Sequence, residues 1–280
     1  MTAFVSALLM GCSFGVDYDV PFRLEEVLQP NFLPWTNANE TRYRALVKAK
    51  WGAPWFIESR GFQNAIPEVA RAQAALFERF GFRAEWDLDR LYACLFDFLF
   101  EPSARVRALV AQELAEVDHT REDLLCAQLR FGGDTSGKTG VSFDDSFQFN
   151  VLEQLPQVWR FLRDLVEREL APVGREFKVF VTTDSDHAKE IAIAEWGDRL
   201  LHVPGEITHV DRSAAHRQTL DTFAKVAADN YMLGFCDSAV ISKSGMGALG
   251  LWRAPLKPGR AWLWENGQIR PYAHAYGAQV

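Results

Sequence analysis

Short apolar runs alternate with segments of helical periodicity along the second half of the chain. The predicted strands cover residues 124–129, 177–182, 200–203 and 237–242, and the predicted helices cover residues 151–170, 187–196, 214–235 and a stretch that begins near residue 244. Strands that alternate with helices are typical of a parallel sheet covered on both faces, so we predict an α/β fold. Such sheets bind ligands beyond the carboxyl ends of their strands, and we expect chemistry in the loops after Leu129, Thr182 and Ile241.

The first half of the chain is aromatic and rich in loops. The pattern predicts a helix over residues 2–10, a strand over 13–16, a helix over 66–80 and an apolar segment over 88–100. Ser103 is a suitable N-cap for a further helix, whose apolar positions are Val106, Leu109, Val110 and Leu114. A charged break near residue 120 predicts the boundary between an N-terminal lobe, residues 1–120, and a C-terminal lobe, residues 121–280.

Composition and charge narrow the possible functions. The 280 residues are 48% hydrophobic and 24% charged, which excludes a disordered chain. The formal net charge of −7 provides no global basic field, so we expect no nucleic-acid partner, and any phosphate must be bound by a local cradle. No apolar run reaches the roughly 18–20 residues of a membrane span, and we expect no membrane contact within this chain.

The four cysteines are Cys12, Cys94, Cys126 and Cys236, and no two of them have CxxC spacing. The absence of CxxC spacing disfavours a zinc site, and we interpret the cysteines as small buried side chains. Whether two of them form a disulfide stays open at this point.

The first candidate site follows the predicted strand 124–129. Gln128 and Arg130 are followed by a turn that contains Gly132, Gly133 and Asp134. An arginine carries a permanent charge and a rigid fork of donors that suits phosphate oxygens. Glycines beside it allow backbone amides to approach a ligand closely. The alternative is a surface ion pair between Arg130 and Asp134.

The second candidate site follows the predicted strand 177–182, where Asp184 and Asp186 are separated by one residue. Two carboxylates at this spacing can hold a divalent metal that bridges the diphosphate of a nucleotide sugar. The alternative is a strand end whose acidic residues lie at the positive end of the next helix.

The third candidate site lies between the predicted strand 237–242 and the last helix. Ser242, Ser244 and Gly245 would place two hydroxyls and free backbone amides at a helix N-terminus, which is a ready anion site. The alternative is an ordinary capped helix start.

The histidines and the serines give no independent sign of a metal centre or a hydrolase. None of the six histidines has ligand spacing, so most are interpreted as structural. His209 is the exception, because it follows a predicted strand and precedes Asp211 by two residues. No GxSxG nucleophile elbow occurs.

Taken in order, these motifs resemble the donor-binding half of inverting GT-B fucosyltransferases that use GDP-fucose. That superfamily includes α1,2-, α1,6- and protein O-fucosyltransferases and the plant xyloglucan enzymes. The matching segments, which lie within residues 88–255, are Gln128-Leu129-Arg130 with Gly133-Asp134, then Val181-Thr182-Thr183-Asp184, then Asp229 with Cys236-Asp237 and Ser242-Lys243-Ser244-Gly245. The resemblance implies two Rossmann-like lobes, with GDP-fucose as donor, no metal and no other cofactor.

The resemblance also implies roles for the candidate residues. Arg130 would hold the β-phosphate and neutralise the leaving group. Ser242, Ser244 and Gly245 would surround the diphosphate, with Gln128, Gly132, Gly133 and Asp134 in the first motif. Asp184 would lie near the nucleotide, and His209 with Asp211 near the guanine edge. Asp144 and Asp145 follow Arg130 in a loop where the α1,6 branch carries an acidic residue, and they are the candidates for catalytic acid–base work.

The N-terminal lobe departs from the family pattern. The first strand and its glycine-rich loop would precede residue 1, so we expect this lobe to be incomplete. It would bind the acceptor, a glycan or glycoprotein, with Trp35, Trp51 and Trp55 as stacking platforms. A eukaryotic protein would act in glycan biosynthesis in the Golgi lumen, and a bacterial one in the cytoplasm. The alternatives are a metal-dependent nucleotide-sugar transferase that uses Asp184 and Asp186, or a non-catalytic protein that binds GDP-sugars or glycans.

Overall fold

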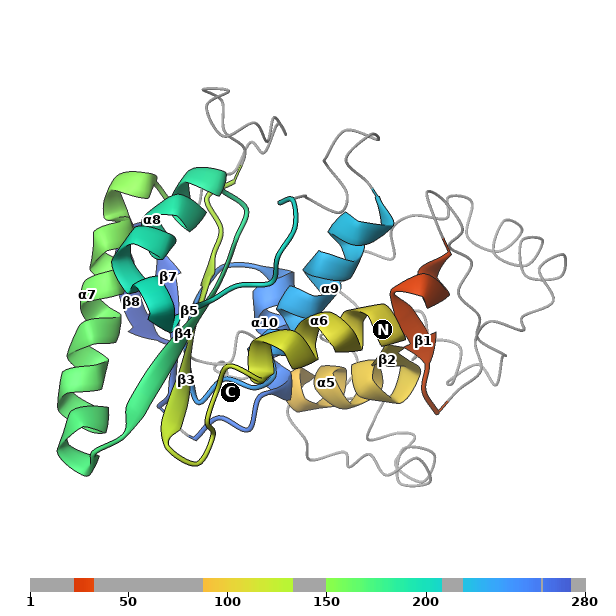
Figure 1. Ribbon diagram of the computed structural model, residues 1–280, viewed down its shortest axis with the longest axis horizontal. Helices are drawn as coiled ribbons and strands as arrows, with labels where there is room; N and C mark the ends of the chain where they lie inside the picture. Colours follow the sequence, from red (N-terminus) through yellow and green to blue (C-terminus); the bar gives the residue numbers. More distant parts are fainter. Residues whose placement is uncertain (1–22, 33–87, 133–149, 208–218, 258, 273–280) are drawn as a thin grey trace, which may run out of the picture. The chain divides into compact units, whose positions relative to one another are not determined.

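The computed structural model describes residues 23–32, 88–132, 150–207, 219–257 and 259–272 (Figure 1). The chain forms two compact units: one comprises Met1–Glu25, Gln29–Glu101 and Tyr276–Val280, the other Glu26–Leu28 and Pro102–Ala275. The predicted break near residue 120 thus lies inside the second unit, and the assignment of residues 1–120 and 121–280 to acceptor and donor stays a prediction. Within the described ranges, every helix is too short or too polar to cross a membrane.

In the first unit, the apolar segment predicted over residues 88–100 forms helix α5 (Leu88–Leu99), in which Leu95 and Leu99 are fully buried. The amide of Asn31 donates to the carbonyl of Leu99, and the rings of Phe32 and Phe98 stack with centroids 5.7 Å apart. The 3-10 helix η1 (Leu24–Glu26) precedes strand β1 (Leu28–Pro30), which pairs with β2 (Phe100–Pro102) in a two-stranded sheet. The elements predicted over residues 2–10, 13–16 and 66–80, and the three tryptophans, lie outside the described residues.

The second unit is built on a six-stranded sheet in the order β5-β4-β3-β6-β7-β8. Its strands are β3 (Glu122–Leu129), β4 (Glu176–Thr183), β5 (Leu200–Leu201), β6 (Ser238–Ser242), β7 (Ala261–Glu265) and β8 (Gln268–Pro271). All neighbouring pairs are parallel except β7 and β8, which form a hairpin. The predicted α/β class and parallel sheet are therefore confirmed.

Helices cover both faces of this sheet. They are α6 (Ala104–Leu114), α7 (Leu155–Leu165), α8 (Asp186–Trp196), α9 (Leu220–Leu233) and α10 (Gly245–Arg253). In Figure 1, α7 and α8 lie together on one side of the strands, and α9 and α10 lie with α6 on the other. Ser103 caps α6 as predicted, since its hydroxyl accepts a hydrogen bond from the amide of Val106.

The alternation of side chains along β3 divides the core between the two faces. Leu125, Ala127 and Leu129 are fully buried in one hydrophobic cluster with residues of α7 and α8, including Trp159. Successive side chains of a strand point to opposite faces. Gln128 and, beyond the strand end, Arg130 therefore belong to the face that α9 and α10 cover.

Three segments differ from the sequence prediction. The helix predicted over residues 151–170 is divided into a 3-10 helix η3 (Leu152–Gln154), the α-helix α7 and a π-helix η4 (Val166–Leu170), and a further 3-10 helix η5 (Ala171–Val173) follows. After α8 and the turn η6 (Gly197–Arg199), β5 has two residues rather than the four predicted. The β7–β8 hairpin was not predicted, although Asn266 and Gly267 at its tip both have positive φ, as a two-residue hairpin turn requires.

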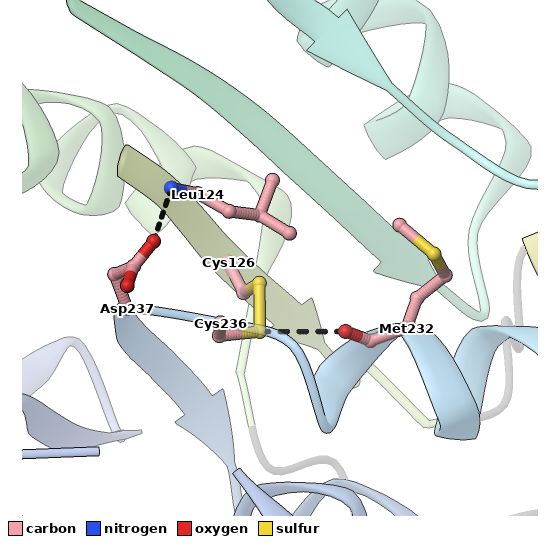
Figure 2. The surroundings of a disulfide bond; sticks show 5 residues. All are labelled: Leu124, Cys126, Met232, Cys236 and Asp237. Carbon is pink, nitrogen blue, oxygen red and sulfur yellow. Dashed lines mark hydrogen bonds between the residues drawn. A yellow bond between two sulfur atoms is a disulfide. The ribbon is translucent and has the colours of Figure 1, made fainter. Parts of the chain in front are cut away.

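A disulfide joins Cys126 in the middle of β3 to Cys236, which lies between α9 and β6 (Figure 2). Asp237 adds two hydrogen bonds at the same place: its side chain accepts from the amide of Leu124, and its amide donates to the carbonyl of Leu124. The disulfide, which the sequence left open, therefore links β3, the strand that precedes Arg130, to the segment that leads into β6.

Candidate functional site

A cavity of about 250 Å³ lies beyond the carboxyl ends of β3 and β4, against α9 and the start of α10. Its walls come from five places in the sequence, and the lining residues are Gln128, Arg130, Thr182, Thr183, Asp184, Ile207, Lys225, Val226, Asp229, Ser244, Gly245 and Met246. This position is where parallel sheets bind ligands, because strand-end loops and helix N-termini converge there.

Hydrogen bonds from both sides fix the backbone at Arg130. The amide of Arg130 donates to the hydroxyl of Ser242 at 2.9 Å, and the carbonyl of Arg130 accepts from the side chain of Asn150 at 3.2 Å. The side chain of Asn150 also reaches the Ser242 hydroxyl and the carbonyl of Trp264. Ser242 is fully buried and supports the Arg130 backbone, whereas Ser244, two residues later, lines the cavity.

The carboxylate of Asp184 closes the turn that follows β3. One oxygen accepts the amide of Phe131 at 2.9 Å, and the other accepts the amide of Gly132 at 3.2 Å. Gly132 has a φ of +82°, a conformation that glycine adopts without strain. Burial raises the pKa of Asp184 to about 6, although the two amides and the charge of Arg130 act in the opposite direction.

The N-terminus of α10 forms the third wall of the cavity. The hydroxyl of Ser244 accepts the amide of Gly247 and caps the helix, so the amides of Gly245 and Met246 begin the first turn beside the cavity. Amides at this end of a helix have no intrahelical acceptors and carry a partial positive charge. Together with the guanidinium of Arg130, they make this wall suitable for an anion such as a diphosphate.

The side chain of Gln128 determines which residue can occupy position 247. A Cβ atom at position 247 would lie 2.5 Å from Oε1 of Gln128, so only glycine fits without displacing that side chain. Gln128 is 5% exposed, and its Oε1 has no hydrogen-bond partner in the described part of the chain.

Helix α9 contributes a buried charged pair. Asp229 belongs to a segment that the sequence analysis matched to the donor-binding motifs, whereas Lys225 was not singled out there. Nζ of Lys225 lies 2.6 Å from Oδ2 of Asp229, and the two side chains are 7% and 4% exposed. The hydroxyl of Thr182, at the end of β4, donates to the same oxygen at 3.0 Å. A lysine four residues before an aspartate on a predicted helix was the available signal, but most such pairs lie on solvated faces.

The structure brings together part of the predicted site. Gln128, Arg130, Asp184, Ser244 and Gly245 line one cavity, and Gly132 and Ser242 support it from behind. The remaining predicted site residues lie outside the described residues: Gly133, Asp134, Asp144, Asp145, His209 and Asp211.

The metal alternative relied on Asp184 and Asp186. Both oxygens of Asp184 already accept backbone amides, and Asp186 is an exposed residue of the first turn of α8, after the cap residue Ser185. Among the residues that the structure describes, no group of three or more His, Cys, Asp or Glu side chains is arranged to hold a metal ion.

Several solved structures are similar to this chain. An α-1,6-fucosyltransferase, NodZ, soaked with GDP-fucose matches with a TM-score of 0.59 at 12% identity, over 97% of this chain and 92% of that one. A mutant of Arabidopsis thaliana FUT1 in complex with GDP matches with a TM-score of 0.55 at 16% identity, over 94% of this chain and 66% of that one. NodZ from Bradyrhizobium matches with a TM-score of 0.54 at 13% identity, over 96% and 91% of the two chains.

Comparison of the sequence alone gave no match to a protein-family profile and none to a curated protein. The structural similarity shows that this chain has the GT-B-type, Rossmann-like fold of these fucosyltransferases. The family resemblance inferred from the ordered motifs is confirmed at the level of the fold.

Proposed function

We propose that this chain is a glycosyltransferase that moves fucose from GDP-fucose to a hydroxyl group of a glycan or protein acceptor, with inversion at the anomeric carbon. The observation that carries the proposal is that Arg130 and the N-terminus of α10 line one cavity at the carboxyl ends of the central strands. The fold supports it, because similar proteins of the same fold were solved with GDP-fucose or GDP.

In the proposed reaction, the acceptor oxygen attacks the anomeric carbon of fucose while the bond from that carbon to the β-phosphate oxygen breaks. The electron pair of the broken bond stays on the diphosphate, whose negative charge grows in the transition state. Arg130 and the amides of Gly245 and Met246 would stabilise that charge, which is the usual role of preorganised donors. The acceptor proton would pass to a carboxylate, and Asp144 and Asp145 remain the predicted candidates.

The proposal is tested with R130A and a matched control, R163A. Arg163 is an exposed residue of α7 that pairs with Glu195, so its loss should change neither binding nor turnover more than about twofold. Removing a charged donor from the diphosphate should weaken GDP binding about 10-fold or more in calorimetry. Turnover of GDP-fucose, followed as GDP release with a panel of glycan acceptors, should fall at least about 100-fold.

Three results would redirect or refute the proposal. R130A turnover close to that of wild type would refute the role of Arg130. Turnover that disappears with a chelator and returns with a divalent cation would favour the metal-dependent transferase. GDP binding by the wild-type protein without turnover on any acceptor would favour the non-catalytic GDP-sugar-binding protein.

A further inference from the structure

Helix α10 packs closely against α9 within the second unit. A Cβ atom at position 250 would lie 2.6 Å from Cβ of Leu233 and 2.9 Å from the carbonyl oxygen of Asn230, so only glycine permits this approach without a shift of one helix. One turn earlier on α10, Nδ2 of Asn230 donates a hydrogen bond to the carbonyl oxygen of Met246 at 2.8 Å. Asn230 is 8% exposed, and because a carbonyl oxygen can only accept, its amide nitrogen must face Met246.

The peptide unit between Met246 and Gly247 is held at both of its polar ends. Its carbonyl accepts from Asn230, and its N–H, the amide of Gly247, donates to the hydroxyl of Ser244 at 3.4 Å. A peptide unit is planar, so contacts at its two opposite ends fix its orientation. The peptide units of a helix are aligned along one axis, so the free amides of Gly245 and Met246 in the same turn take their direction from this unit.

Neither helix formation nor core packing gives a reason for asparagine at position 230. Asparagine is a weaker helix former than alanine or leucine, and Asn230 lies inside α9, not at one of its ends. Burying an amide group costs free energy unless that group is hydrogen-bonded, whereas an apolar side chain would need no partner there. The side chain is better explained by its contact with the first turn of α10.

We propose that Asn230 is a positioning residue for the β-phosphate of the donor: it orients the first turn of α10 so that the amides of Gly245 and Met246 meet that phosphate. The inference rests on the proposed function for the identity of the ligand and for the place of the diphosphate. Asn230 does not line the cavity, so it acts through the backbone of α10 and not on the nucleotide itself. Because hydrogen bonds depend on direction, a turned first peptide unit would weaken the phosphate contact and leave the nucleoside contact unchanged.

The test compares GDP with GMP by calorimetry, because the two nucleotides differ only in the β-phosphate. The variants are N230L, which keeps a branched side chain without a donor, and N230A, which keeps a good helix former in α9. The matched control is R253M. Arg253 lies at the C-terminal end of α10, and its guanidinium carbon is 4.1 Å from the centroid of the Tyr231 ring on α9. Its loss therefore loosens the same pair of helices at the end of α10 away from the cavity.

Wild type should bind GDP at least about 10-fold more tightly than GMP, because the β-phosphate adds charge-assisted hydrogen bonds. N230L and N230A should lose about 10-fold in GDP affinity and keep the wild-type affinity for GMP. R253M should keep the wild-type preference for GDP even where it lowers the stability of the protein. A merely structural role of Asn230 would weaken GDP and GMP by the same factor, since both share the nucleoside and the α-phosphate.

The inference is overturned if either folded variant of Asn230 keeps the wild-type preference for GDP. An equal loss of preference in R253M also overturns it, because any loosening of the two helices would then have the same effect. A wild-type protein that binds neither nucleotide, or that binds GDP no more tightly than GMP, refutes the proposed function instead, so the two failures are distinct. Leucine is larger than asparagine and can overpack a buried site. If N230L does not fold, N230A decides the question by the same comparison.

Discussion

Asp184 should make the stability of this protein fall as the pH rises through the weakly acidic range. The pKa of its carboxyl is raised from 3.8 to about 6 in the folded state because the side chain is buried. A raised pKa means that the folded state binds the proton more tightly than the unfolded state does. The stabilisation from the protonated carboxyl is therefore complete below about pH 4 and is lost as the pH rises through 6.

The size of the effect follows from the two pKa values. A difference of about two pKa units corresponds to about 3 kcal/mol in the free energy of unfolding. D184N removes the titrating group but keeps a side chain of the same shape with one carbonyl acceptor for the amides of Phe131 and Gly132. Loss of the second acceptor costs about 1–2 kcal/mol at every pH.

The measurement compares wild type and D184N by urea unfolding between pH 4 and pH 7.5. Between these limits, the free energy of unfolding of D184N should gain up to about 3 kcal/mol relative to wild type. The matched control is D186N, which changes an exposed carboxylate two residues away and should change the free energy of unfolding by less than about 0.5 kcal/mol. If the free energies of unfolding of wild type and D184N change in parallel with pH, burial does not raise the pKa of Asp184.

Three further variants test the scaffold around Arg130. The double variant C126S/C236S opens a loop of 110 residues, and chain entropy predicts that the free energy of unfolding falls by about 4.7 kcal/mol at 25 °C. The measurement is urea unfolding under non-reducing conditions. A loss below about 1 kcal/mol would show that the disulfide does not constrain the unfolded chain in this way. G247A should displace the side chain of Gln128 and weaken GDP binding, because the new Cβ would otherwise lie 2.5 Å from Oε1 of Gln128. Q128A/G247A removes this clash and should recover part of the lost affinity. Unchanged GDP affinity in G247A would contradict this packing.

The sequence predicted the central strands and the capped helices because their signals are local. Apolar runs define β3, β4 and β6, and the hydroxyl groups of Ser103 and Ser244 cap α6 and α10 in the structure. The hairpin of β7 and β8 was missed although Asn266-Gly267 is a strong hairpin signal. Its first strand, β7, pairs with β6 through residues that are 22 apart in the sequence, a tertiary relation that local periodicity does not contain.

The residues of the candidate site also fall into those that local sequence signals predicted and those that they did not. Arg130, Asp184 and Ser244 were predicted because each follows a strand, and parallel strand ends converge. Lys225 was not, and Asp229 was named only through the family resemblance, because a charged pair at helical spacing has the same pattern whether it is solvated or buried. Only their burial and the contact from Thr182 distinguish them. Ser242 was correctly placed at a strand end, but its hydroxyl is used by the Arg130 amide, which sequence spacing cannot reveal.

These contacts explain how a strand-end arginine can be preorganised for an anion. Every residue from Arg130 to Gly132 has its backbone held by a side chain: Ser242 and Asn150 bind Arg130, and Asp184 binds both Phe131 and Gly132. A loop already fixed in its binding conformation loses little conformational entropy when a ligand arrives. In the proposed reaction, binding energy from the diphosphate would then be available for the transition state rather than for ordering the loop. At neutral pH, the desolvated carboxylate of Asp184 lowers the free energy of unfolding. The same carboxylate accepts two of these amides and so keeps the loop after β3 in one conformation.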